Sequence, residues 1–199
     1  MARSVDYYFT PQSPWTYLGH QRFVRIARAA GVAINLVPAD FNKVFPASGG
    51  LPLGQRAPQR QAYRLVELAR HSSNLRLPLN VKPKFFPVAG DDAARLIIAA
   101  DRQDGTEAAL RLCEATFAAV WVQERDIADA AVLQQLLAET GLPAQRLEQS
   151  RGAAVQQQYE SNTRKAIDAG VFGAPSYVID GEIFWGQDRL DFVERALQS

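Results

Sequence analysis

The stretch Ser13-Pro14-Trp15-Thr16 separates an apolar run, Val5 to Phe9, from an amphipathic segment that ends near Ala30. Aromatic and β-branched residues predict a strand over the first run, and apolar residues at helical spacing predict a helix after it. Ser13 then stands at the N-terminus of that helix, where unpaired amides and the helix dipole favour negative charge. We therefore expect this position to hold an anion.

In redox proteins built from a strand, a tight connection and a helix, the positions of Ser13 and Thr16 belong to a Cys-x-x-Cys pair. Here both cysteines are absent, and the single cysteine of the chain is Cys113. One cysteine excludes an internal disulfide and a dithiol that cycles between two redox states. We expect Ser13 to stabilise a thiolate that a ligand brings; capping of the helix is the alternative role of a serine at this position.

Composition limits the class of protein. The chain has 199 residues, with 22 basic and 21 acidic side chains, and this balance predicts no nucleic-acid partner and no anionic membrane surface. No apolar run approaches the roughly 20 residues that span a bilayer, and no apolar leader is visible at the N-terminus. We expect a cytoplasmic protein with a small-molecule partner and no metal site.

The rest of the chain predicts a second strand over 34–37 and, near the C-terminus, a hairpin joined by Asp180-Gly181. Two stretches, Phe41 to Gly54 and Ser73 to Gly90, are too rich in turn residues for regular structure and are candidate walls of a substrate site. Helices are expected over 58–72, 93–101, 107–122, 130–139, 153–169 and 189–198.

This order of elements predicts an α/β fold, a thioredoxin-like core with an inserted all-helical domain. The thioredoxin-like domain is expected to be discontinuous, over 1–39 and 165–199, with the helical domain over 40–164. In such folds a cis proline faces the Cys-x-x-Cys position, and Ala174-Pro175 stands at the corresponding place. A cis bond there would leave the Ala174 backbone open to an extended peptide ligand; a turn proline is the alternative.

Three ordered motifs resemble the 2-hydroxychromene-2-carboxylate isomerases and the kappa-class glutathione transferases, relatives of the disulfide-forming thioredoxin-like oxidoreductases. The motifs are Tyr8-Phe9 with Ser13 to Leu18, Gly170 to Ser176, and Phe184 to Leu190. The resemblance covers essentially the whole chain. It implies a glutathione-dependent isomerase of aromatic catabolism, with glutathione as cofactor, an aromatic small-molecule substrate and a homodimer.

The resemblance also implies the roles of individual residues. Ser13 matches the family serine whose hydroxyl hydrogen-bonds the glutathione sulfur. Ala174, before Pro175, matches the residue whose backbone pairs with the cysteinyl part of the tripeptide. Asp188 matches the acid that receives the γ-glutamyl ammonium group, with Gln187 beside it. From the sequence alone, Asp188 is also a candidate N-cap of the last helix.

Two positions depart from the family pattern. Arg60 stands where the family commonly has a lysine that contacts the glycyl carboxylate, and arginine keeps the charge but changes the geometry. A family asparagine expected before the next helix is Gly50 here, so its contact near the sulfur or the substrate is missing or supplied otherwise.

Alternatives to the isomerase stay open. A kappa-type transferase would conjugate electrophiles and consume glutathione, and a redox-inactive thioredoxin-like protein would bind peptides at Pro175. Several other residues with polar or aromatic chemistry are expected in structural roles. They are His20 and His71 on helices, Cys113 in the core, and Tyr7, Tyr8, Trp15 and Phe85 in the core or along an aromatic pocket.

Overall fold

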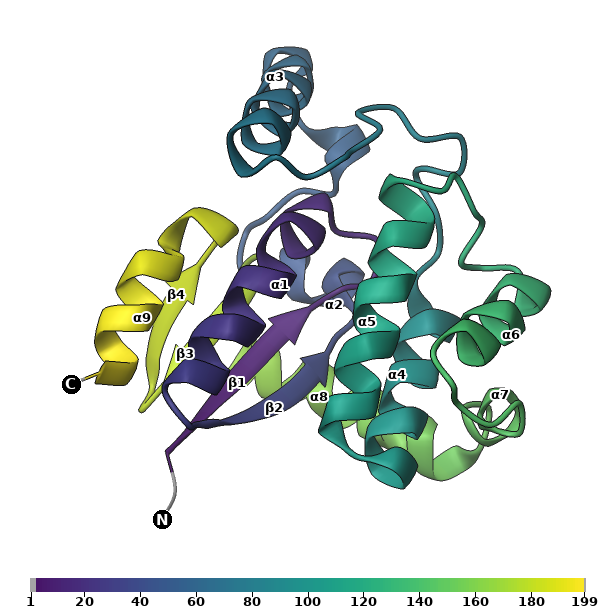
Figure 1. Ribbon diagram of the computed structural model, residues 1–199. Coiled ribbons are helices and arrows are strands. Elements are labelled where there is room, and N and C mark those ends of the chain that lie inside the picture. The colour runs from purple at the N-terminus through teal and green to yellow at the C-terminus, as the bar shows by residue number, and fades with distance from the viewer. Residues whose placement is uncertain (1–2, 199) are drawn as a thin grey trace.

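The computed structural model describes residues 3–198 and contains a four-stranded sheet in the order β2-β1-β3-β4 (Figure 1). β1 (Ser4–Phe9) pairs in parallel with β2 (Ala33–Pro38) and antiparallel with β3 (Ser176–Ile179), which continues into β4 (Glu182–Trp185). The parallel pair and the C-terminal hairpin confirm the predicted thioredoxin-like α/β fold.

The hairpin turn follows from its two residues. Asp180 and Gly181 have φ angles of 51° and 87°, the left-handed values that a tight two-residue turn requires and that Asp-Gly adopts readily. The predicted hairpin is therefore confirmed in both its strands and its turn.

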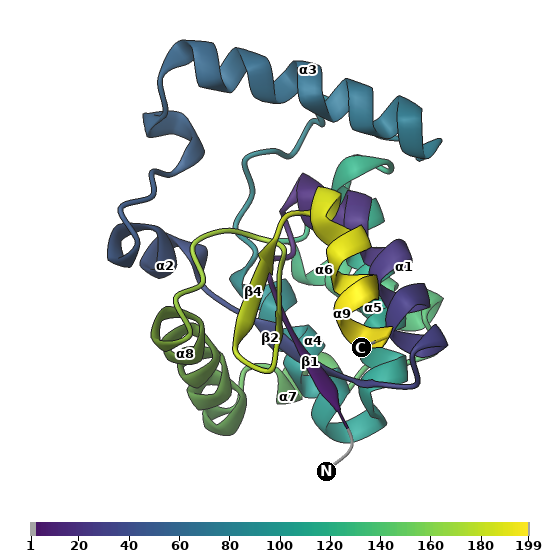
Figure 2. The ribbon, with the colours of Figure 1, turned by 90° about the vertical axis from the view of Figure 1, so that its left-hand side faces the viewer.

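Helices cover both faces of the sheet (Figures 1 and 2). Val5, Tyr7 and Phe9 point to one face and Tyr8 to the other, as the alternation of a strand dictates. The first face packs against α1 (Pro14–Ala29), α4 (Asp91–Asp104), α5 (Thr106–Trp121) and α9 (Leu190–Gln198). The second packs against α2 (Phe41–Ala47) and α8 (Ala153–Asp168).

The prediction of irregular structure from residue 41 to residue 54 is wrong at its start, because α2 occupies its first seven residues. Asp40 caps this helix by accepting the amide of Asn42 at 3.0 Å, and Phe41 and Val44 are buried against the sheet. The turn signals begin only at Pro46, in the last turn. The short α7 (Arg146–Gln149) was also not predicted.

The remaining helices are α3 (Pro58–Leu75) and α6 (Ala130–Glu139). In Figures 1 and 2, α3 lies apart from the sheet layers, above the N-terminus of α1. Within the described residues, Leu68 is the one residue of α3 that is fully buried. The core of the first face joins β1 to α4 and α5, and the predicted boundary at residue 164 falls inside α8; the division into two domains stays a prediction.

Two core residues have the structural roles that the sequence predicted. Cys113 is fully buried, and burial raises the pKa of its thiol well above its usual range. His20 is buried between the Leu110 carbonyl, 3.2 Å from Nε2, and the Tyr7 hydroxyl, 3.3 Å from Nδ1. The carbonyl can only accept, so Nε2 carries the proton and Nδ1 accepts from Tyr7. Burial lowers the pKa of His20 to about 4.

Among residues 3–198, no helix combines the length and the apolar character needed to cross a membrane.

Candidate active site

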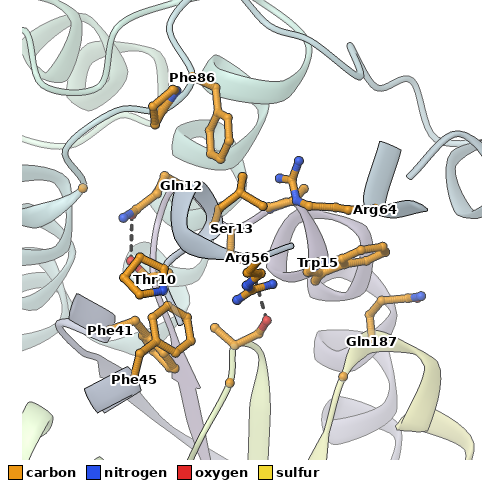
Figure 3. A pocket seen from close by; sticks show the side chains of 18 of the residues that line it. Thr10, Gln12, Ser13, Trp15, Phe41, Phe45, Arg56, Arg64, Phe86 and Gln187 are labelled. Atoms are coloured by element: carbon orange, nitrogen blue, oxygen red, sulfur yellow. Dashed lines mark hydrogen bonds between the residues drawn. The ribbon is translucent and has the colours of Figure 1, made fainter. Parts of the chain in front are cut away.

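A pocket of about 700 Å³ opens between the N-terminus of α1, the loop before β3 and the underside of α3 (Figure 3). Five of the six predicted site residues line it, whereas Pro175 is buried and does not. Both irregular stretches also contribute, through Pro52 to Gly54 and Phe86 to Gly90. The predicted residues therefore come together in one place.

The Ser13 hydroxyl makes two hydrogen bonds, one as acceptor and one as donor. As the N-cap of α1, its Oγ accepts the amide of Thr16 at 3.2 Å, which confirms the capping role. The same hydroxyl donates to the carbonyl of Ala174 at 3.4 Å, a long hydrogen bond. Ser13 thus joins the helix N-terminus to the loop before β3.

The Ala174-Pro175 peptide bond is cis, as the resemblance implied, and the alternative of an ordinary turn proline is wrong. Its surroundings are fixed by Ser176, whose hydroxyl donates to Gly173 at 2.7 Å, and by the amide of Gly186, which donates to Pro175 at 2.9 Å. Within residues 3–198 the amide of Ala174 has no hydrogen-bond partner, and its carbonyl accepts only from Ser13. This residue presents a free backbone edge to the pocket.

Asp188 lies at the pocket rim in η2 (Gln187–Arg189), with about half of its side chain exposed. Its carboxylate pairs with the neighbouring Arg189 at 2.6 Å. In the described part of the chain it accepts no helix amide, so the alternative of an N-cap at Asp188 is wrong. An exposed ion pair of this kind is weak and leaves the carboxylate available to a ligand cation.

Gln187 is buried, and both ends of its side-chain amide have partners within the protein. Its Oε1 accepts from Arg22 of α1 at 3.0 Å, and its Nε2 donates to Nδ1 of His71 of α3 at 2.9 Å. His71 in turn forms a T-shaped contact with Trp15, with ring centroids 5.7 Å apart. These contacts tie α1 and α3 to η2, so the Gln187 side chain is held in a bridging position.

α3 presents a polar stripe to the pocket at successive helical turns, and the stripe consists of Arg60, Arg64, Glu67 and His71. Glu67 accepts from Arg70 at 2.8 Å, and this hydrogen bond lowers the pKa of its carboxyl. Arg60 is exposed and, within residues 3–198, pairs with no carboxylate. Arg64 was not singled out in the sequence, although it follows Arg60 by one turn.

Aromatic residues form much of the remaining lining, and sequence reasoning identified them incompletely. Two roles were considered for Trp15, Tyr7 and Tyr8, the core and the pocket. Trp15 lines the pocket, whereas Tyr7 and Tyr8 belong to the core. Phe86, next to the candidate Phe85, lines the pocket instead of it. Gln12, Arg56 and Tyr63 also line the pocket and were missed in the sequence, whereas Phe41, Asn42 and Phe45 belong to the stretch 41–54 that the sequence predicted as a candidate wall.

Gly50, which stands where the family asparagine was expected, does not line the pocket, and a Cβ at this position would meet the side chain of Phe45. Asn42, in α2, is an amide side chain that does line the pocket. Across the described residues, no group of three or more His, Cys, Asp or Glu side chains is placed to bind a metal ion.

Comparison with known proteins places the chain in a family. The model of the DsbA-like thioredoxin domain matches residues 4–198. The chain is also 32% identical to a 2-hydroxychromene-2-carboxylate isomerase from Sphingobium xenophagum, over 99% of both proteins. The chain belongs to the DsbA-like thioredoxin family. Within it, the resemblance to the 2-hydroxychromene-2-carboxylate isomerases and kappa-class glutathione transferases is confirmed.

Two further matches support this placement within the DsbA-like family. Glutathione S-transferase kappa 1 from Caenorhabditis elegans is 25% identical, over 98% of this chain and 90% of that protein. A solved structure of a 2-hydroxychromene-2-carboxylate isomerase superposes with a TM-score of 0.84 at 26% identity, covering 98% of this chain and 94% of that one. These relatives are named as enzymes, an isomerase and a transferase.

Proposed function

We propose that this protein is a glutathione-dependent isomerase that converts 2-hydroxychromene-2-carboxylate to trans-o-hydroxybenzylidenepyruvate in naphthalene-type aromatic catabolism. The observation that carries the proposal is the Ser13 hydroxyl, at a helix N-terminus and 3.4 Å from the Ala174 carbonyl, in the wall of a pocket of about 700 Å³. The isomerases among its relatives support the choice of reaction. The cytoplasmic location and the homodimer are parts of the same proposal.

The residues of the pocket fit glutathione. The unpaired amide and the carbonyl of Ala174 match a peptide backbone that adds as a short strand. Asp188 offers a carboxylate to the γ-glutamyl ammonium group, and Arg60 offers a guanidinium to the glycyl carboxylate. Because Gln187 is held by Arg22 and His71, its role is to position this wall.

Ser13 is suited to stabilise a thiolate. A hydroxyl has one proton to donate, and turning that proton from the Ala174 carbonyl to a ligand sulfur would free the carbonyl for the ligand backbone. The N-terminus of α1 adds its partial positive charge. A thiol of ordinary pKa, about 8.5, is mostly protonated at neutral pH, and both effects lower that pKa.

Bound glutathione would supply a nucleophilic thiol for reversible addition to the unsaturated substrate, which permits bond rotation without net consumption of the tripeptide. The chain itself holds the tripeptide through Ala174 and Asp188, directs the Ser13 proton, and surrounds the substrate with Trp15 and Phe86. A transferase that conjugates electrophiles is the second candidate, because kappa-class transferases are also among its relatives.

The test is turnover of 2-hydroxychromene-2-carboxylate, followed by absorbance, with and without glutathione, together with an assay of free thiol. We expect turnover only with glutathione and no loss of thiol. Stoichiometric loss of thiol would instead support the transferase. Absence of turnover and of retention on immobilised glutathione would support the peptide-binding alternative.

The control for the site is a pair of aspartates close in sequence. Asp188→Asn removes the carboxylate at the pocket rim, whereas Asp191→Asn makes the same change on the exposed first turn of α9, outside the pocket lining. Only the Asp188 variant should raise the KM for glutathione.

A further inference from the structure

Arg64 is a pocket residue for which the structure shows no anionic partner. Its guanidinium carbon lies 5.1 Å from the ring centre of Phe86 and 5.8 Å from that of Trp121, within the range of cation–π contacts. Within residues 3–198 its guanidinium makes no hydrogen bond and no ion pair. Figure 3 shows its side chain reaching from α3 toward the part of the pocket where Ser13 and Trp15 lie.

The acidic groups of the pocket do not neutralise Arg64, because each has another partner. Glu67 accepts a hydrogen bond from Arg70, and Asp188 forms an ion pair with Arg189. Asp91 accepts a hydrogen bond from the Tyr159 hydroxyl at 3.0 Å. These contacts leave the middle of the α3 stripe with an excess of positive charge.

Arg64 is partly buried, and burial disfavours its charged form. Loss of solvent and the neighbouring Arg56 lower the pKa of the guanidinium to about 10. The side chain is therefore still a cation at neutral pH. A partly desolvated cation without a counter-ion is unfavourable, and an anion that enters the pocket would relieve the cost.

The surroundings of Arg64 define the kind of anion. The guanidinium beside these rings is a planar fork without a partner in the described structure, and such a fork can donate two parallel hydrogen bonds to a carboxylate. Phe86 and Trp15 provide flat apolar surface in the same pocket. A planar aromatic or conjugated acid matches both features, whereas the flexible glycyl end of a tripeptide is served by the more exposed Arg60, one turn away on α3.

We propose that Arg64 binds the carboxylate of an aromatic or conjugated acid substrate and selects such acids over neutral electrophiles. The proposal rests on the proposed function for the identity of the reaction. It adds the residue that makes the enzyme prefer negatively charged substrates. It assigns two carboxylates to two arginines of α3, the glycyl carboxylate to Arg60 and the substrate carboxylate to Arg64.

The test compares two probes that differ by a carboxylate, trans-o-hydroxybenzylidenepyruvate and o-hydroxybenzylideneacetone. Each is titrated into the protein by calorimetry, with and without S-methylglutathione, whose blocked sulfur cannot react. We expect the wild type to bind the pyruvate more tightly, and Arg64→Met to lose about 10- to 100-fold of that affinity, the range for hydrogen bonds between charged groups. Binding of the acetone probe should change little.

Three comparisons make the result specific. Arg64→Lys keeps the charge and should recover part of the affinity. Arg25→Met removes an arginine from the exposed face of α1, outside the pocket lining, and should leave the preference intact. Methionine retains the packing on Phe86 and Trp121, and thermal unfolding checks that the Arg64→Met variant is folded.

The outcomes separate this proposal from the proposed function. It is overturned if the wild type shows no preference for the carboxylate, or if Arg64→Met retains the preference. It is also overturned if Arg64→Met weakens S-methylglutathione instead of the probe. If the protein binds the pyruvate through Arg64 but does not bind glutathione, the proposed function is contradicted and the assignment of Arg64 is supported.

Discussion

The Ser13 hydroxyl has one proton and two candidate acceptors, the Ala174 carbonyl and a ligand sulfur. If the sulfur receives it, Ser13→Ala removes a hydrogen bond to a charged group, worth about 1.5 to 3 kcal/mol. The pKa of the bound glutathione thiol should then rise by about one to two units. Titration of thiolate absorbance in the complex measures this shift.

Ser13→Ala also removes a helix cap, which costs about 1 kcal/mol of stability, so the variant needs a matched control. Asp129 caps α6 by accepting the amide of Ala131 at 2.8 Å, outside the pocket lining. Asp129→Ala should lower stability to a similar degree and leave the thiol pKa unchanged. An unchanged thiol pKa in the Ser13 variant would remove the proposed role of the hydroxyl.

His20 makes stability depend on pH. Its folded pKa of about 4 lies below the ordinary value near 6.5, so the unfolded chain binds the extra proton. The stability due to neutral His20 is complete above about pH 6.5 and is lost as the pH falls toward about 4. Over this window wild type should lose about 3 kcal/mol more than His20→Gln, measured by urea unfolding. Parallel pH profiles of the two proteins would show that His20 does not titrate in this way.

At the scale of elements, α3 is weakly attached. It has 18 residues but buries only Leu68 fully in the described structure. A hydrogen bond from Gln187 to His71 attaches the helix to η2, and one from Tyr17 to the Pro78 carbonyl at 2.6 Å attaches the segment that follows the helix. Elements with few buried contacts open most easily.

We therefore expect the amides of α3 to exchange hydrogen at least about tenfold faster than those of α5, which buries ten residues. A ligand that contacts Arg60 and Arg64 should slow exchange in α3 and leave α5 unchanged. Hydrogen exchange followed by mass spectrometry measures both effects. Equal protection of the two helices would show that α3 is a fixed part of the fold.

The contact between α1 and η2 depends on a glycine. A Cβ at Gly19 would lie 2.8 Å from Cβ of Gln187 and 3.0 Å from the hydroxyl of Tyr177. Because Cβ cannot rotate away, Gly19→Ala should destabilise the protein by roughly 1 to 3 kcal/mol. Gly54→Ala, where a Cβ has open space, is the control. Equal unfolding temperatures of the two variants would contradict this packing.

At the scale of the whole molecule, local sequence patterns predict the sheet and most helices. The strand at Val5 and the Asp180-Gly181 turn depend on propensities that act within a few residues. The start of α2 was missed because Pro46 and the glycines after it dominate the pattern. Burial of Phe41 against the sheet, a tertiary effect, decides the structure there.

The site shows the same division between local and distant effects. Ser13 and Ala174 were found because each sits in a local motif, and the structure brings them to 3.4 Å. The environment of Arg64 was not predictable, because Phe86 and Trp121 reach it from other parts of the chain. The bridge from Gln187 to Arg22 and His71 likewise joins three elements that only the fold brings together.

The central claim is that the pocket beside Ser13 binds glutathione, and calorimetric titration of the protein with the tripeptide tests it most directly. We expect one glutathione per chain, with binding weakened about tenfold or more by Asp188→Asn, the loss of a charged hydrogen bond, and unaffected by Asp191→Asn. No detectable binding at millimolar glutathione, or binding that both variants leave unchanged, would contradict the account.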